Sequence, residues 1–134
     1  MLVVDASVCI ELLLAGGIPE DLQRRDLAAP PLLWSETASG LRELAFRQLV
    51  TPDAAKSALD RLPSLGIERH VPEQLYQEAY AVASRLGWAK TYDAEYVALA
   101  RILAAPLLTR DARLRRGAGH LATIVGPTDL VSLP

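Results

Sequence analysis

The 134-residue sequence is poor in the residues that build disulfide scaffolds and zinc sites. It contains a single cysteine, Cys9, and two isolated histidines, His70 and His120. One cysteine excludes an intrachain disulfide and suits a reducing compartment, so we expect a cytoplasmic protein. No Cys/His cluster with metal-ligand spacing is present, which argues against a zinc site of that type.

Long apolar runs and a strong excess of one charge are also missing. Asp5 and Glu11 interrupt the apolar N-terminal segment, and no run approaches the roughly 18 residues that a membrane span requires. We therefore expect neither a secretory signal nor a transmembrane helix. The 14 Lys and Arg residues against 16 Asp and Glu give a net charge of −2. The chain is not a polycation, so any nucleic-acid binding has to come from a local patch.

Arginines provide the candidates for such a patch. Five are concentrated late in the chain and two share an earlier predicted helix: Arg101, Arg110, Arg113, Arg115 and Arg116, and Arg42 and Arg47. Charge alone leaves two interpretations open, solvated helix faces and a phosphate-binding surface.

Short apolar segments alternate with segments of helical periodicity along the whole chain. Strands are predicted at residues 2–4, 27–29, 67–71, 107–109 and 122–125, and helices at 7–15, 31–49, 52–62, 73–87 and 91–103, with helical turns at 21–25 and 111–116. This alternation predicts a three-layer α/β/α sandwich with a mainly parallel sheet of four to five strands. Because no repeat, low-complexity tract or long linker interrupts it, residues 1–134 are expected to form one domain.

Four acidic residues occupy comparable places in this pattern. Asp5 and Asp111 follow predicted strands, Asp93 begins a predicted helix, and Glu36 lies in the first turns of another. Functional groups collect at the carboxyl ends of parallel strands, so all four side chains could face one cleft. Each also has a simpler interpretation: the three aspartates as helix N-caps, and Glu36 as a surface residue.

A cluster of carboxylates has a definite chemical consequence. The charges repel one another, so at least one group binds a proton unless a cation neutralises them. Mg²⁺, with Mn²⁺ as the alternative, prefers such oxygen ligands. Held there, it activates water for in-line attack on phosphorus, as nucleases and phosphatases require. Arg110 and Arg113 are then the candidates for binding substrate phosphates.

The sequence around these acids resembles the PIN-domain family, and within it the small VapC-type toxins of toxin–antitoxin pairs. The matching segments are LVVDAS around Asp5, PPLLWSETASGLR around Glu36, TYDAEYVALA around Asp93 and LLTRDARL around Asp111. They occur in the family order and cover nearly the whole chain, and the two later motifs are the most specific. The resemblance implies a PIN-like fold, metal-dependent endoribonuclease activity and these four acids as the catalytic metal ligands.

The resemblance also implies supporting residues. Ser7 and Thr109 match hydroxyl residues of the first and last motifs and are expected to support the site without ligating metal. Tyr92 is expected to pack or hydrogen-bond beside it. Other nearby acids rank lower because they lie outside the motif positions: Glu11, Glu43 and Glu95.

Family members are usually dimeric and bound to a cognate antitoxin. The resemblance therefore implies a homodimer or a toxin–antitoxin hetero-oligomer, an RNA substrate and no membrane partner. Apolar residues that could pair with another protein are Trp34, Phe46, Trp88 and residues 10–14. The same residues could instead be buried in the core, as most large apolar side chains are.

Two other functions remain open. A phosphatase with Asp5 as nucleophile would be expected to carry a second acid two residues later and a lysine near the last strands, where this chain has Ser7 and Arg110. A non-catalytic α/β binding module would use the acidic pocket to bind a partner without metal-dependent cleavage.

Overall fold

Five short parallel strands form one central sheet in the computed structural model, which describes residues 1–134. The strands are β1 (Leu2–Val4), β2 (Leu27–Ala29), β3 (Glu68–Arg69), β4 (Leu107–Leu108) and β5 (Ile124–Val125). Their order is β3-β2-β1-β4-β5. The chain builds one half of the sheet outward from β1 and then returns to build the other half. The carboxyl ends of β1 and β4 therefore flank a topological switch point, where open α/β sheets bind ligands.

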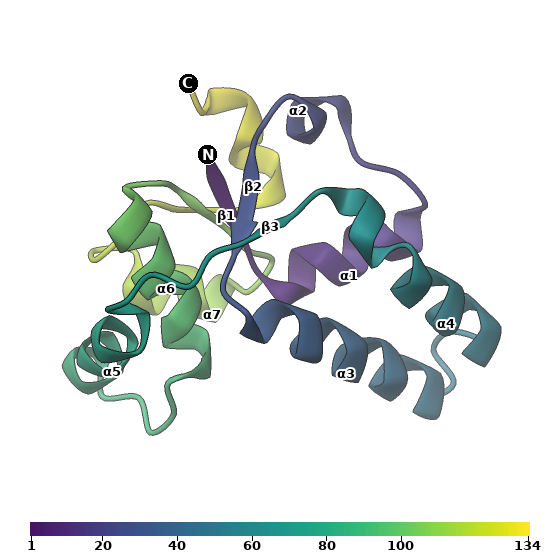
Figure 1. Cartoon of the computed structure of the whole chain (residues 1–134), viewed down its shortest axis with the longest axis horizontal. Helices are drawn as coiled ribbons and strands as arrows, with labels where there is room; N and C mark the ends of the chain where they lie inside the picture. The colour runs from purple at the N-terminus through teal and green to yellow at the C-terminus, as the bar shows by residue number, and fades with distance from the viewer.

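Helices cover both faces of the sheet (Figure 1). One layer contains α1 (Ala6–Ala15), α3 (Leu32–Phe46) and α4 (Pro52–Asp60), and the other contains α5 (Leu75–Leu86) and α6 (Tyr92–Leu103). The remaining helices are α2 (Glu20–Gln23), α7 (Ala112–Ala118), η1 (Leu62–Leu65) and η2 (Pro127–Ser132). The three-layer α/β/α prediction is confirmed, and the sheet is parallel throughout.

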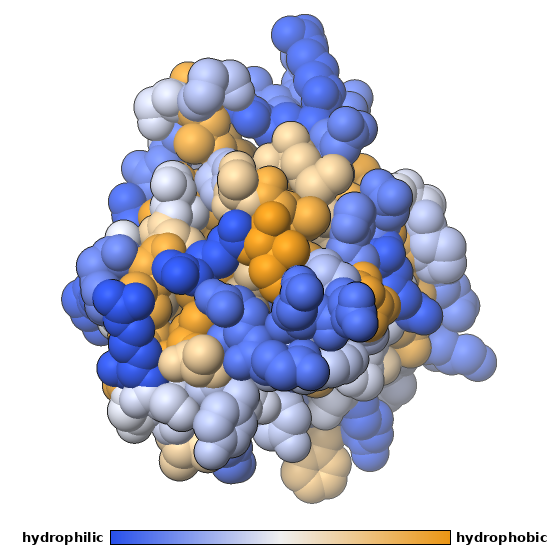
Figure 2. Space-filling view, turned by 60° about the vertical axis from the view of Figure 1, so that its left-hand side comes forward, coloured by the Kyte–Doolittle hydropathy of each residue, from blue (hydrophilic) through white to orange (hydrophobic).

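The core joins the two layers through the sheet. All three residues of β1 are fully buried, and Tyr96 of α6 is the largest fully buried side chain. Gly40 in α3 marks a close approach to α1, because a Cβ atom there would lie 2.4 Å from Ile10 Cδ1. Figure 2 turns α5 and α6 toward the viewer and shows apolar side chains in the middle of this face, surrounded by hydrophilic ones.

Several predicted boundaries were wrong. The helix predicted at 31–49 ends at Phe46, since Gln48 adopts a left-handed φ of 60°. The strand predicted at 67–71 is reduced to Glu68–Arg69, whose exposed charged side chains suit the edge of a sheet. The helix predicted from residue 73 begins at Leu75, and the turn predicted at 111–116 is the helix α7. No helix is long and apolar enough to cross a membrane.

Candidate metal and active site

The four predicted acids come from four different elements and meet at the carboxyl edge of the sheet. Asp5 follows β1 and caps α1, and Asp111 follows β4 and caps α7. Asp93 lies in the first turn of α6, and Glu36 lies in α3. Glu36, Asp93 and Asp111 line one cleft of about 590 Å³. Asp5, which is 7% exposed, lies at the strand end next to it.

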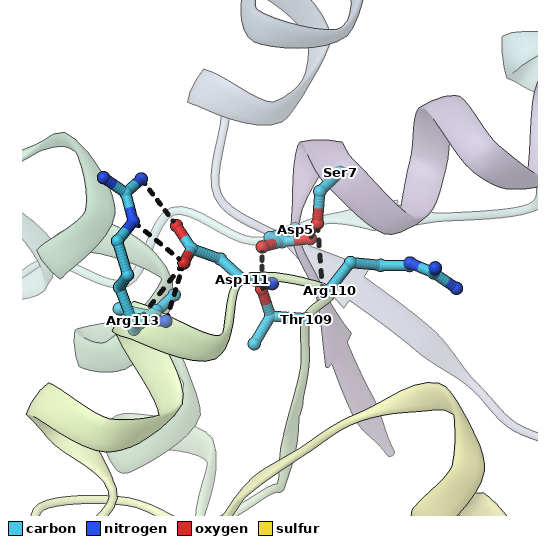
Figure 3. Close-up of polar contacts among 7 residues, drawn as sticks. Asp5, Ser7, Thr109, Arg110, Asp111 and Arg113 are labelled. Carbon is cyan, nitrogen blue, oxygen red and sulfur yellow. Dashed lines mark hydrogen bonds and ion pairs between the residues drawn. The ribbon is translucent and has the colours of Figure 1, made fainter.

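Asp5 accepts three hydrogen bonds, and Figure 3 shows the two that come from hydroxyl groups. The Ser7 hydroxyl donates to Oδ1 at 2.6 Å, and the Thr109 hydroxyl donates to Oδ2. The Val8 N–H donates to Oδ1 at 3.1 Å, which is the N-cap interaction of α1. The same carboxylate therefore caps α1 and belongs to the acidic cluster.

The two hydroxyls also connect Asp5 to the loop after β4. Ser7 Oγ accepts from the Arg110 N–H at 3.2 Å, and Thr109 Oγ1 accepts from the Asp111 N–H at 2.9 Å. Each hydroxyl thus donates to Asp5 and accepts from the loop backbone. The position of Asp111 relative to Asp5 depends on this network.

Replacing Thr109 with valine tests the network. Valine has a similar shape but leaves a buried Asp5 oxygen and the Asp111 N–H without partners, so we expect the free energy of unfolding to fall by about 1–3 kcal/mol. Urea denaturation measures the change. Thr123→Val is the matched control, because Thr123 is exposed just before β5 and its hydroxyl makes no hydrogen bond. Equal stability of the two variants would contradict the interpretation.

The acids influence one another electrostatically. Burial raises the pKa of Asp5, and the nearby Asp111 raises it further against the effect of the three hydrogen bonds. Burial also raises the pKa of Glu36, with additional contributions from Asp93 and Asp5. The pKa of Asp93 rises through burial and through the charges of Asp111 and Asp5. The four carboxylates therefore form one coupled group.

Asp111 differs from the other three acids in that its pKa is lowered, because the cation Arg113 lies beside it. Burial acts to raise its pKa, but hydrogen bonds from the Arg113 side chain and backbone and from the Leu114 N–H lower it overall. The Arg113 guanidinium lies 3.2 Å from Oδ2 and also lines the cleft. Arg110 points away from the acids and pairs with Glu11 of α1 at 2.9 Å (Figure 3). Of the two arginines predicted to bind phosphate, only Arg113 lines the acidic cleft.

Tyr96 is a site residue that the motifs did not identify. Its buried hydroxyl donates to Glu36 Oε1 and so joins α6 to α3 across the sheet edge. It follows Asp93 by three residues, and this helical spacing places both side chains on one face of α6. That spacing was the available sequence signal.

The remaining predicted neighbours divide into two groups. Glu95 is 7% exposed, and burial together with Glu36 raises its pKa, so it adds to the field of the cluster. Glu43 is exposed and lies 3.9 Å from Arg47. Tyr92 was expected to pack or hydrogen-bond beside the site, and it lines the cleft with three of the acids while being 55% exposed.

The donor set fits a hard divalent cation. The four groups are carboxylates, the oxygen ligands that such cations prefer. Burial first and the charges of neighbouring acids second raise the pKa values of three of them, and a bound cation would favour their ionised forms. No three His, Cys, Asp or Glu side chains are already gathered in metal-binding geometry. Glu36 accepts the Tyr96 hydrogen bond through Oε1, which leaves Oε2 for an ion. Asp111 is paired with the Arg113 guanidinium through both of its oxygens, so binding an ion there requires that pairing to be exchanged.

The raised pKa of Asp93 predicts a pH-dependent stability in EDTA. The folded state holds this proton more tightly than the unfolded chain, so ionised Asp93 lowers the free energy of unfolding above the raised pKa. We expect Asp93→Asn to exceed the wild type in Tm most clearly at neutral pH. The gap should close as pH falls through the raised pKa toward the ordinary value of 3.8. Thermal unfolding across this range tests the effect, and a gap independent of pH would contradict it.

Comparison with known proteins is consistent with this geometry. Residues 2–119 match the family described as PIN domain. The VapC ribonuclease Mb0985 of Mycobacterium bovis is 37% identical over 115 residues, covering 85% of this chain and 88% of that protein. Two solved structures share the fold. PAE2754 from Pyrobaculum aerophilum has a TM-score of 0.74 and 24% identity, covering 98% of this chain and 93% of that one. A toxin–antitoxin complex from Klebsiella pneumoniae has a TM-score of 0.58 and 15% identity, covering 93% and 96%.

Proposed function

Because this chain belongs to the PIN-domain family, we propose that it is an endoribonuclease that requires Mg²⁺ or Mn²⁺ and acts as the toxin of a toxin–antitoxin pair. The observation that carries the proposal is the coupled group of four carboxylates at the sheet's switch point. A relative that is 37% identical across most of both chains is named a ribonuclease, and this name supports RNA as the substrate class.

The chain's own residues then have distinct tasks. Asp5, Glu36, Asp93 and Asp111 would hold the cation, which when bound supplies a Lewis acid for water activation and for stabilising charge on phosphoryl oxygens. Ser7 and Thr109 fix the orientation of Asp5, and Tyr96 fixes Glu36. Arg113, whose side chain is 84% exposed, is available to bind a substrate phosphate once its pairing with Asp111 is exchanged.

Partners are part of the same proposal. A protein antitoxin is supported by the structural similarity to a solved toxin–antitoxin complex. Phe46, which is 74% exposed at the end of α3, offers apolar surface for such a partner or for a homodimer. The buried free thiol of Cys9 is compatible with a reducing cytoplasm.

The alternative of a phosphatase with Asp5 as nucleophile gains nothing from the geometry. The position two residues after Asp5 holds Ser7, whose hydroxyl donates to Asp5, where a second acid would be expected, and the loop after β4 carries Arg110 where a lysine would be expected. A covalent aspartyl-phosphate on Asp5 would nevertheless be direct evidence for it.

Metal removal is the primary test. Purified protein free of antitoxin should cleave RNA with Mg²⁺ or Mn²⁺, lose this activity in EDTA and regain it when excess Mg²⁺ or Mn²⁺ is restored. A labelled RNA resolved on a denaturing gel measures cleavage, and rising salt should weaken it because phosphate contacts are involved. Undiminished cleavage in EDTA would overturn the proposal of a metal-dependent nuclease.

A further inference from the structure

The acidic cleft has an aromatic wall that the proposed metal chemistry does not explain. Trp88 and Tyr92 line it together with Glu36, Asp93 and Asp111. Trp88 lies in the segment between α5 and α6, just after Gly87 ends α5 with a φ of 72°, and Tyr92 is the first residue of α6. Tyr92 is 55% exposed and is not part of the hydrophobic core, so the fold does not need its ring for core packing.

Trp88 is anchored on one side. It is half-buried against the core, and a Cβ atom at Gly117 of α7 would lie 3.5 Å from its Cζ2. Trp88 is also one of the residues that line the cleft. This arrangement holds a large flat ring in a fixed place beside the acids.

A free cation lies between the two rings in sequence. Lys90 lines the same cleft, and no acidic group lies within 4.0 Å of its ammonium group, in contrast to Arg110, Arg113 and Arg115. The acidic cluster repels a polyanionic substrate. Lys90, an unpaired cation at the border of the cluster, attracts such a substrate. Aromatic rings interleaved with cations are typical of sites for single-stranded nucleic acid.

We propose that Trp88 and Tyr92 form a base-stacking platform for unpaired RNA, with Lys90 contacting the adjacent phosphate. This inference rests on the proposed ribonuclease function and narrows its substrate to single-stranded or looped segments. Duplex bases are already stacked on one another and cannot lie on protein rings, whereas unpaired bases can. The cleft volume of about 590 Å³ suits a nucleotide-sized group.

Fluorescence can follow Trp88 alone. The chain has two tryptophans, so Trp34→Phe leaves Trp88 as the single indole signal. In this background and in EDTA, a short unstructured RNA oligonucleotide should quench the emission saturably. An RNA duplex of the same length should bind more weakly. Absence of quenching, or equal binding of the duplex, would overturn the proposal.

Substitutions at Tyr92 separate stacking from other roles. Tyr92→Leu should weaken oligonucleotide binding by about 5- to 150-fold, the range for losing one stacked base, while Tyr92→Phe should bind as the wild type does. Tyr80→Leu is the matched control, since Tyr80 is 69% exposed on α5 and does not line the cleft. An equal loss in Tyr80→Leu, or no loss in Tyr92→Leu, would contradict the platform.

The salt dependence tests Lys90. Lys90→Gln should weaken binding of different single-stranded sequences similarly and reduce the slope of log K against log salt by about 0.7. An unchanged slope would remove Lys90 from the proposal. Metal-dependent cleavage without quenching would contradict the platform alone, and quenching without metal-dependent cleavage would contradict the nuclease function alone.

Discussion

Asp93→Asn is expected to reduce metal-dependent RNA cleavage by about 100-fold or more without lowering Tm. Changes to residues that merely support metal ligands typically cost 10- to 100-fold, and loss of a ligand carboxylate should cost at least as much. Asp93 accepts no side-chain hydrogen bond within the protein and lines the cleft directly. The substitution therefore removes a charge from the cluster without breaking a structural contact.

The stability half of this prediction follows from the repulsion among the acids. The charges of Asp111 and Asp5 disfavour ionised Asp93, so replacing Asp93 with a neutral amide removes this repulsion from the folded state. A variant that is inactive but no less stable cannot owe its inactivity to unfolding. This separates a functional carboxylate from a structural one.

Asp53→Asn is the matched control. Asp53 also lies in the first turn of a helix, α4, so both substitutions remove the same favourable interaction with a helix N-terminus. Asp53 is exposed and lies outside the cleft, and its variant should cleave RNA at the wild-type rate. Cleavage by Asp93→Asn that matches the wild type and remains sensitive to EDTA would remove Asp93 from the ligand set.

The sequence predicts the backbone of the site well. A three-residue apolar strand ending in Asp5, and a second ending before Asp111, place both carboxylates at one sheet edge because parallel strands share that edge. Helix-start positions likewise locate Asp93 and Asp111. These features follow from the local pattern of apolar strands and helix starts. The alternation of strands and helices along the sequence also indicates that the sheet is parallel.

Side-chain pairing depends on contacts between distant residues and was harder to predict. Arg110 and Arg113 are equivalent in sequence terms, yet one turns to Glu11 of α1 and the other to Asp111. The choice depends on how α1 lies relative to the loop after β4, which no local pattern encodes. Tyr96 was missed for the same reason, since its partner Glu36 is 60 residues away.

Tyr96→Phe is expected to lower RNA cleavage by about 10- to 100-fold, the typical effect of losing a partner that orients a metal ligand. Phenylalanine preserves the buried ring and deletes the hydroxyl that donates to Glu36. Tyr96 acts here as a positioning residue, because it contacts Glu36 and does not line the cleft.

The pH profile distinguishes this role from simple destabilisation by Tyr96→Phe. The Tyr96 hydrogen bond lowers the pKa of Glu36 against burial and the neighbouring charges of Asp93 and Asp5. Without it the pKa of Glu36 rises further, and Glu36 has to be ionised to hold a cation. The acid limb of cleavage rate against pH should therefore move to higher pH. Tyr80→Phe, which removes the hydroxyl of an exposed tyrosine outside the cleft, should leave it unchanged. A profile for Tyr96→Phe that is lower but unshifted would show that the hydroxyl does not control the ionisation of Glu36.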